Sequence, residues 1–157
     1  MKKYFVIFGC FLAACSSNNS SETTTKIAEV QEVPVIDSTS FVGGCYTAIL
    51  NQDTSQLLLR HKNGAKSISG ELEINNFEKD RNKGTLNGEV EGDLIITWYD
   101  FQSEGVGSVR QVVFKIQGDT LYEGYGNLDK MGDTLYFNNI GALKYLTEKP
   151  YVKRDCP

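Results

Sequence analysis

Alternation of apolar and polar residues is the dominant pattern over residues 41–157. In segment 67–75 every second residue is isoleucine, leucine or glycine, and the residues between them are polar. Segment 85–91 repeats this alternation. A period of two residues predicts a β-strand with one buried face. Further strands are expected over 45–50, 56–61, 94–102, 109–116, 120–126 and 134–138.

Tight turns are expected between these strands, because glycine next to asparagine or aspartate favours a hairpin connection. Such turns stand at 63–64, 92–93, 118–119 and 132–133, and a longer glycine-containing turn at 105–108. Segment 78–84 is predicted to be a polar connecting turn, and 140–146 a short helix at most. About eight short strands joined by tight turns favour an all-β fold, a single antiparallel up-and-down barrel. Its architecture resembles the lipocalin and avidin barrels; a β-sandwich is the alternative.

The N-terminus has the pattern of an export signal. Lys2 and Lys3 precede an apolar run, which ends in Leu12-Ala13-Ala14-Cys15 and is followed by serine and asparagine. The run is too short to span a bilayer, which takes about 20 apolar residues. This segment resembles the lipobox of bacterial lipoprotein precursors. The resemblance implies cleavage before Cys15, and acyl chains (palmitate among them) on Cys15 as the membrane anchor.

Three regions follow from this interpretation: a signal peptide over 1–14, a lipidated cysteine with a flexible linker over 15–40, and one β-barrel domain over 41–157. The linker is rich in serine, threonine and glutamate and has too few apolar residues to fold alone. Removal of the two N-terminal lysines would change the formal charge from −4 to −6. An acidic chain without clustered lysine and arginine is a poor nucleic-acid partner.

The expected location is the bacterial cell envelope, with the lipid anchored in the outer membrane and the domain on the periplasmic or the surface face. Ser16 after the lipid-bearing cysteine favours the outer membrane by the enterobacterial sorting pattern. Cys10 would leave with the signal peptide and Cys15 carries the lipid, so Cys45 and Cys156 remain. In an oxidising compartment two remaining cysteines predict a disulfide, which would fasten the C-terminal tail to the first strand.

The central segment also resembles a group of exported bacterial lipoproteins to which no activity is assigned. The matching residues are Gly44-Cys45-Tyr46, Glu78-Lys79-Asp80 with Asn82 and Gly84, Ser103-Glu104-Gly105 with Ser108 and Arg110, and Glu123-Gly124-Tyr125-Gly126. The resemblance implies an exported lipoprotein β-domain and adds no site residue.

Arg110 is the most informative polar residue of the expected barrel. It shares its strand face with Val112 and Phe114, so it should point inward, where a charge needs a carboxylate partner. Glu104 lies across the tight turn and Glu123 on the next strand. Together with the aromatic residues Trp98, Tyr99 and Tyr125, they form a candidate cluster. The cluster is either a polar anchor in a ligand cavity or a structural ion pair in a filled barrel.

Catalysis has little support in the sequence, which contains no Gly-x-Ser-x-Gly motif. His61 is expected at a solvated strand end, and no group of metal ligands or cofactor motif stands out. Asp100, Glu104 and Glu123 are the candidates for a glycosidase carboxylate pair. The sequence therefore predicts a non-enzymatic envelope lipoprotein that binds a small ligand or a protein. The alternatives are a structural or stress-related lipoprotein with a filled barrel and, more remotely, an envelope glycan hydrolase.

Overall fold

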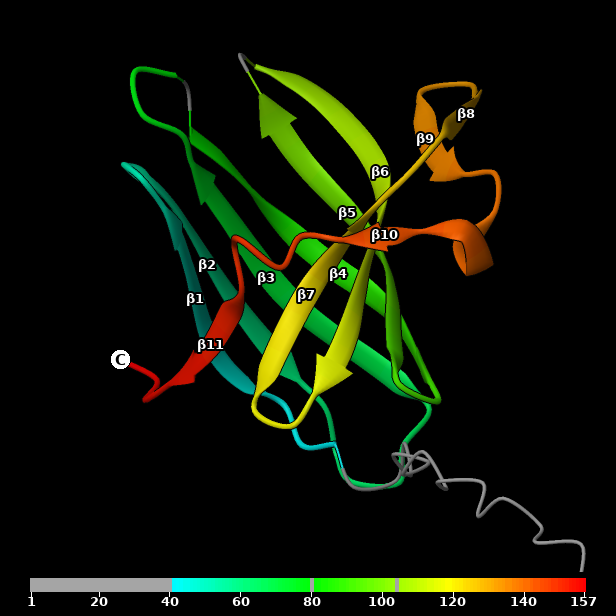
Figure 1. Ribbon diagram of the computed structural model, residues 1–157. Helices are drawn as coiled ribbons and strands as arrows, with labels where there is room; N and C mark the ends of the chain where they lie inside the picture. Colours follow the sequence, from blue (N-terminus) through cyan, green and yellow to red (C-terminus); the bar gives the residue numbers. More distant parts are fainter. Residues whose placement is uncertain (1–40, 80, 104) are drawn as a thin grey trace, which may run out of the picture. The chain divides into compact units, whose positions relative to one another are not determined.

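The computed structural model describes residues 41–79, 81–103 and 105–157. The expected signal peptide, Cys15 and the linker lie outside the described residues, as does Glu104. The described chain is almost entirely β-structure (Figure 1). Its strands are β1 (Gly44–Leu50), β2 (Asp53–Arg60), β3 (Ser67–Asn75), β4 (Arg81–Glu91), β5 (Leu94–Ser103), β6 (Val106–Gln117), β7 (Thr120–Tyr125), β8 (Leu128–Met131), β9 (Thr134–Phe137), β10 (Lys144–Tyr145) and β11 (Tyr151–Arg154). Within these residues, no helix has the length and apolar character that crossing a membrane requires.

Eight of the strands close into an antiparallel barrel. Strands β1 to β7 pair in sequence order, and β11 fills the remaining place between β7 and β1. All neighbours within this ring are antiparallel. The prediction of a single up-and-down barrel is therefore confirmed, and the β-sandwich alternative is wrong. The remaining strands, β8 to β10, belong to an insertion between β7 and β11.

Three local expectations differ from the structure. The polar residues 81–84 form the start of β4 and not part of a turn, because β3 supplies a full antiparallel partner for them. The strand expected at 134–138 is β9, which lies outside the ring and pairs with β8 and, in parallel, with β6. The last barrel strand is the unforeseen β11, and the short helix considered at 140–146 is a single 3-10 turn over Ile140–Ala142 followed by β10.

The barrel interior is filled by one continuous apolar cluster. The alternate residues that face inward along the strands are almost all buried, as a barrel of this size requires. The cluster contains Phe41, Tyr46, Ala48, Leu57, Leu59, Ile68, Leu72, Ile74, Leu86, Val90, Ile95, Tyr99, Val112, Phe114, Ile116, Leu121 and Tyr151. Burial of this apolar surface is the main source of the domain's stability.

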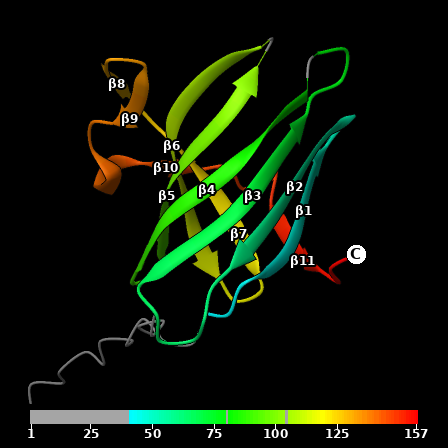
Figure 2. The ribbon, with the colours of Figure 1, turned by 180° about the vertical axis from the view of Figure 1, so that it is seen from behind.

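One part of the barrel wall is much less paired than the rest. β5 and β6 pair over ten residues, whereas β6 and β7 pair over four and β7 and β11 over two. Beyond Phe114 the strands β6 and β7 separate: β9 pairs with the freed edge of β6, and β10 pairs with the end of β7. The barrel is therefore splayed at one end, which is seen from both sides in Figures 1 and 2.

This splayed end is called the mouth, and the opposite end the closed end. The hairpin turns β1–β2, β3–β4 and β5–β6 lie at the mouth, and the β2–β3, β4–β5 and β6–β7 turns at the closed end (Figure 1). The described chain starts at the closed end, where the carbonyl oxygen of Phe41 lies 2.8 Å from Nδ1 of His61.

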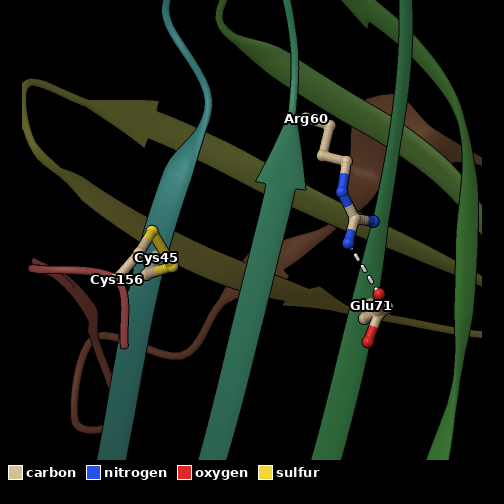
Figure 3. The surroundings of a disulfide bond; sticks show 4 residues. All are labelled: Cys45, Arg60, Glu71 and Cys156. Carbon is tan, nitrogen blue, oxygen red and sulfur yellow. Dashed lines mark hydrogen bonds and ion pairs between the residues drawn. A yellow bond between two sulfur atoms is a disulfide. The ribbon is translucent and has the colours of Figure 1, made fainter.

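The Cys45–Cys156 disulfide is present, as the sequence predicts, with 5.2 Å between the two Cα atoms. It lies on the outside of β1 and joins this strand to the tail after β11 (Figure 3). Beside it, an ion pair of 2.7 Å between Arg60 and Glu71 joins β2 to β3. Closing a loop of this length stabilises a fold by about 4–5 kcal/mol in the chain-entropy model. The bond therefore supports the strand that completes the ring.

Glycine at inward positions of β4 lets neighbouring strands approach closely. A side chain at Gly88 would run into the backbone of Ile96 and Thr97, and one at Gly84 would run into the backbone of Asp100 and Phe101. Glycine inside a strand commonly marks such a close approach of two backbones. These positions allow the strong curvature of the barrel wall.

We predict that Gly88→Ala destabilises the domain by about 1–3 kcal/mol, because the added methyl group forces two paired strands apart. Gly107→Ala is the matched control, since a Cβ there meets no atom within 4 Å. Urea unfolding monitored by circular dichroism measures both variants. Equal unfolding free energies for the two would contradict the close-approach account.

Candidate binding site at the barrel mouth

Arg110 faces the barrel interior near the mouth. It lies opposite Tyr99 in the β5–β6 pairing, and Tyr99 is fully buried. The guanidinium carbon of Arg110 is 5.6 Å from the ring centre of Tyr99 and 5.7 Å from that of Phe101. These two rings stack on each other with their centres 4.6 Å apart. The cation is therefore held over an aromatic surface, an arrangement that favours a positive charge.

The hydrogen bonds of Arg110 are incomplete. Its Nη2 atom lies 3.9 Å from Oε1 of Glu123, which is a loose ion pair. The other oxygen of Glu123 accepts a 3.1 Å hydrogen bond from the Tyr151 hydroxyl. The Nε atom of Arg110 is buried and has no hydrogen-bond partner among the described residues. Arg110 therefore has donor capacity that the surrounding protein does not use.

Two further buried polar atoms share this condition. Oγ of Ser55 and Oδ1 of Asn82 have no hydrogen-bond partner in the described part of the chain. Both residues pair with the inward-facing Ile74, so they lie on the inner face of the wall. The Ser55 hydroxyl also lies near that of Tyr151 without adequate hydrogen-bond geometry. Buried polar atoms are nearly always paired, so unpaired ones inside one barrel indicate a place for a polar guest or water.

A pocket of about 410 Å³ opens beside Arg110, and we call it the mouth pocket. Phe101, Ser108 and Arg110 of its lining lie on the inner face of the wall, and Leu135 of β9 pairs with Arg110 on the same face. The lining consists of Phe101, Val106, Gly107, Ser108, Val109, Arg110, Lys130, Asp133 and Leu135. Two cationic side chains and several apolar ones therefore share a single opening.

The structure brings together half of the candidate cluster. Tyr99, Arg110 and Glu123 lie on the inner face of the wall. Trp98 lies on the outer face of β5 and is 40% exposed, so the expectation that it lines a cavity or fills the core is wrong. Trp98 alternates with the inward-facing Tyr99 along β5, so only one of these two rings can face the interior. Tyr125 shares the strand face of Leu121 and Glu123, but it is 46% exposed at the end of β7 and therefore does not fill the core.

Sequence reasoning missed Phe101, Tyr151 and Lys130. The position of Phe101 could have been found, since it lies two residues after Tyr99 on the same strand face. Tyr151 and Lys130 come from β11 and β8, whose places beside the barrel the strand pattern does not indicate.

His61 does not lie at a solvated strand end, as the sequence suggested, but is buried. Its Nδ1 atom is 2.8 Å from the carbonyl oxygen of Phe41, and its Nε2 atom is 2.6 Å from that of Ala65. Which of the two ring nitrogens donates depends on the tautomer of the ring. The ring thus ties the start of the described chain to the β2–β3 turn, and it is far from the mouth.

Among the described carboxylates considered for glycoside chemistry, Asp100 and Glu123 do not form a pair. Asp100 is exposed on the outer face of β5, whereas Glu123 lies inside the barrel. Glu104 is outside the described residues. Within the described ranges, no three histidine, cysteine, aspartate or glutamate side chains gather in a way that could hold a metal ion.

Burial shifts the acidity of the interior phenols. It raises the pKa of Tyr99 to about 12, and the nearby positive charge of Arg110 opposes this rise. Burial, followed by the negative charge of Asp119, also raises the pKa of Tyr46 to about 12. The pKa of Tyr151 rises because the hydroxyl is desolvated and faces the negative charge of Glu123. The Tyr99 hydroxyl must be neutral to donate its 3.0 Å hydrogen bond to the carbonyl oxygen of Leu72.

Comparison with known proteins adds no relative to this description. The chain matches no protein-family model, no curated protein and no solved structure.

We predict that the free energy of unfolding decreases as the pH rises from about 10 to 12. Unfolded tyrosine ionises near the lower limit, and the raised pKa of Tyr99 lies near the upper limit. In this interval the unfolded state has already released the phenolic proton and the folded state retains it. Tyr99→Phe should make this decrease of unfolding free energy with pH less steep, by up to about 1.4 kcal/mol per pH unit. Tyr125→Phe, at an exposed position, is the matched control for loss of one hydroxyl. Identical slopes for wild type and Tyr99→Phe in urea titrations would contradict the prediction.

Proposed function

We propose that this protein is a lipid-anchored lipoprotein of the bacterial envelope whose barrel binds a small ligand at its mouth without catalysing a reaction. The observation that carries the proposal is Arg110, which lines an open pocket while its buried Nε atom lacks a partner among the described residues. The lipobox-like segment ending at Cys15 supports the anchor. The disulfide supports an oxidising compartment.

The mouth is a better ligand site than the barrel centre. The centre is occupied by the apolar cluster, including the fully buried Leu72, Leu86 and Phe114. The mouth pocket, at about 410 Å³, is within the range of small-molecule sites. The described chain starts with Phe41 at the closed end, and the pocket opens at the mouth.

A structural or stress-related lipoprotein with a filled barrel is the second candidate. The continuous packing of the core and the disulfide favour it. In a purely structural role, bound water has to satisfy the unpaired polar atoms of Ser55, Asn82 and Arg110. Native mass spectrometry of the protein extracted from its own envelope separates the two: a bound small molecule supports ligand binding, and its consistent absence supports the filled scaffold.

We predict that a bacterium with an outer membrane incorporates labelled palmitate into the wild-type protein and into Cys10→Ser, but not into Cys15→Ser. The reason is that only the cysteine at the expected cleavage site becomes acylated. Gel analysis of the label, with mass spectrometry of the N-terminal peptide, measures the outcome. A mature chain that still begins at Met1, or label that persists in Cys15→Ser, would show that the proposed anchor is wrong.

A further inference from the structure

We propose that the mouth pocket selects a small amphipathic anion, a molecule with one acidic head group and a short apolar body. This inference rests on the proposed function, because it specifies the ligand of the same pocket. It is carried by the charges of the pocket lining, by the unpaired donor of Arg110 and by the exposed apolar side chains beside it.

The charge of the pocket opposes that of the whole protein. The chain has a formal charge of −4, yet among the described residues that line the pocket Arg110 and Lys130 stand against a single carboxylate, Asp133. Lys130 pairs with Leu135 and therefore faces the same side of the sheet as Arg110. Two cations on one concave face of an acidic protein are a recognition feature for an anion.

Glu123 does not fully neutralise Arg110. The 3.9 Å separation leaves room for a closer acceptor, and the Tyr151 hydroxyl already donates to the other Glu123 oxygen. The side chain of Arg110 is 35% exposed, so a ligand can reach its guanidinium group. A carboxylate in the pocket would accept charge-assisted hydrogen bonds from this planar group, which binds carboxylates in a two-point geometry.

The rest of the lining fits an apolar body. Val106 is 65% exposed and Leu135 36% exposed, and both lie in the pocket with the partly buried ring of Phe101. Apolar surface in a concave site is stabilised when a ligand removes it from water. The pocket volume of about 410 Å³ is near the lower end for small-molecule sites, so the ligand is short.

The ligand is a free molecule and not a bilayer lipid. The mature chain would carry a formal charge of −6 after loss of Lys2 and Lys3, and an acidic protein is repelled by anionic head groups. Vesicles containing phosphatidylglycerol distinguish the two sources, since co-sedimentation that depends on Arg110 would identify a lipid head group and overturn this assignment.

The test compares three probes on the lipidated protein in neutral phosphatidylcholine nanodiscs, with empty discs subtracted. The probes are 4-phenylbutanoate, its uncharged analogue 4-phenylbutanol, and acetate, which has the head group alone. Isothermal titration calorimetry should show binding of 4-phenylbutanoate, with 4-phenylbutanol and acetate each weaker by about tenfold or more, because a charge-assisted hydrogen bond contributes about 1.5–3 kcal/mol.

Variants connect this selectivity to the pocket. Arg110→Gln should weaken 4-phenylbutanoate binding by about tenfold, and Lys130→Gln by about threefold. Lys62→Gln, which changes an exposed charge in the closed-end turn, is the matched control and should bind as wild type does. Circular dichroism melts check folding. If Arg110→Gln does not fold, the exposed Lys130→Gln variant decides the question.

Two results would overturn the inference, and they differ in what they say about the proposed function. Equal binding of 4-phenylbutanoate and 4-phenylbutanol, unaffected by Arg110→Gln, would retain a ligand site and reject anion selectivity. If neither 4-phenylbutanoate nor 4-phenylbutanol binds, the proposed ligand class is wrong. Only this result together with the absence of a bound molecule in the native mass spectrum would also reject the binding function.

Discussion

Closure of the barrel depends on two residue pairs between β7 and β11, the shortest pairing in the ring. β11 is only four residues long, and on its other side it pairs with β1 over three residues. The Cys45–Cys156 bond links β1 covalently to the tail that follows β11, just beyond Arg154, the last residue of β11 that pairs with β1. A strand this short makes few backbone hydrogen bonds, and the disulfide adds a covalent link to the ring that the apolar cluster fills.

The same weak side of the wall creates the mouth pocket. β7 pairs with β6 only as far as Phe114, which leaves the edge of β6 free for β9. Arg110 lies in the freed stretch, where the inner face of the wall is no longer covered by β7. It therefore reaches the interior ring surface of Tyr99 and the solvent at once. A barrel closed along its full length would bury this arginine and require a complete ion pair.

Much of this arrangement can be predicted from residue alternation. The period of two identifies seven of the eight barrel strands and places Arg110 on the inner face beside Glu123, while counting cysteines gives the disulfide. Alternation does not show which distant segments become neighbours. The four residues of β11 are too few for a periodic signal, and β8 and β9 join β6 through tertiary pairing alone. The choice between Trp98 and Tyr99 for the interior needed the register of the whole strand, which a short aromatic run does not supply.

Hydrogen–deuterium exchange before and after reduction of the disulfide tests the closure account most directly. If β11 is held mainly through Cys45–Cys156, reduction should raise exchange first at the amides of Tyr151 and Val152 and at Leu121 opposite them. The long β3–β4 and β4–β5 pairings should stay protected under the same conditions. Unchanged protection in β11, or loss of protection that begins in β3 to β5, would contradict the account.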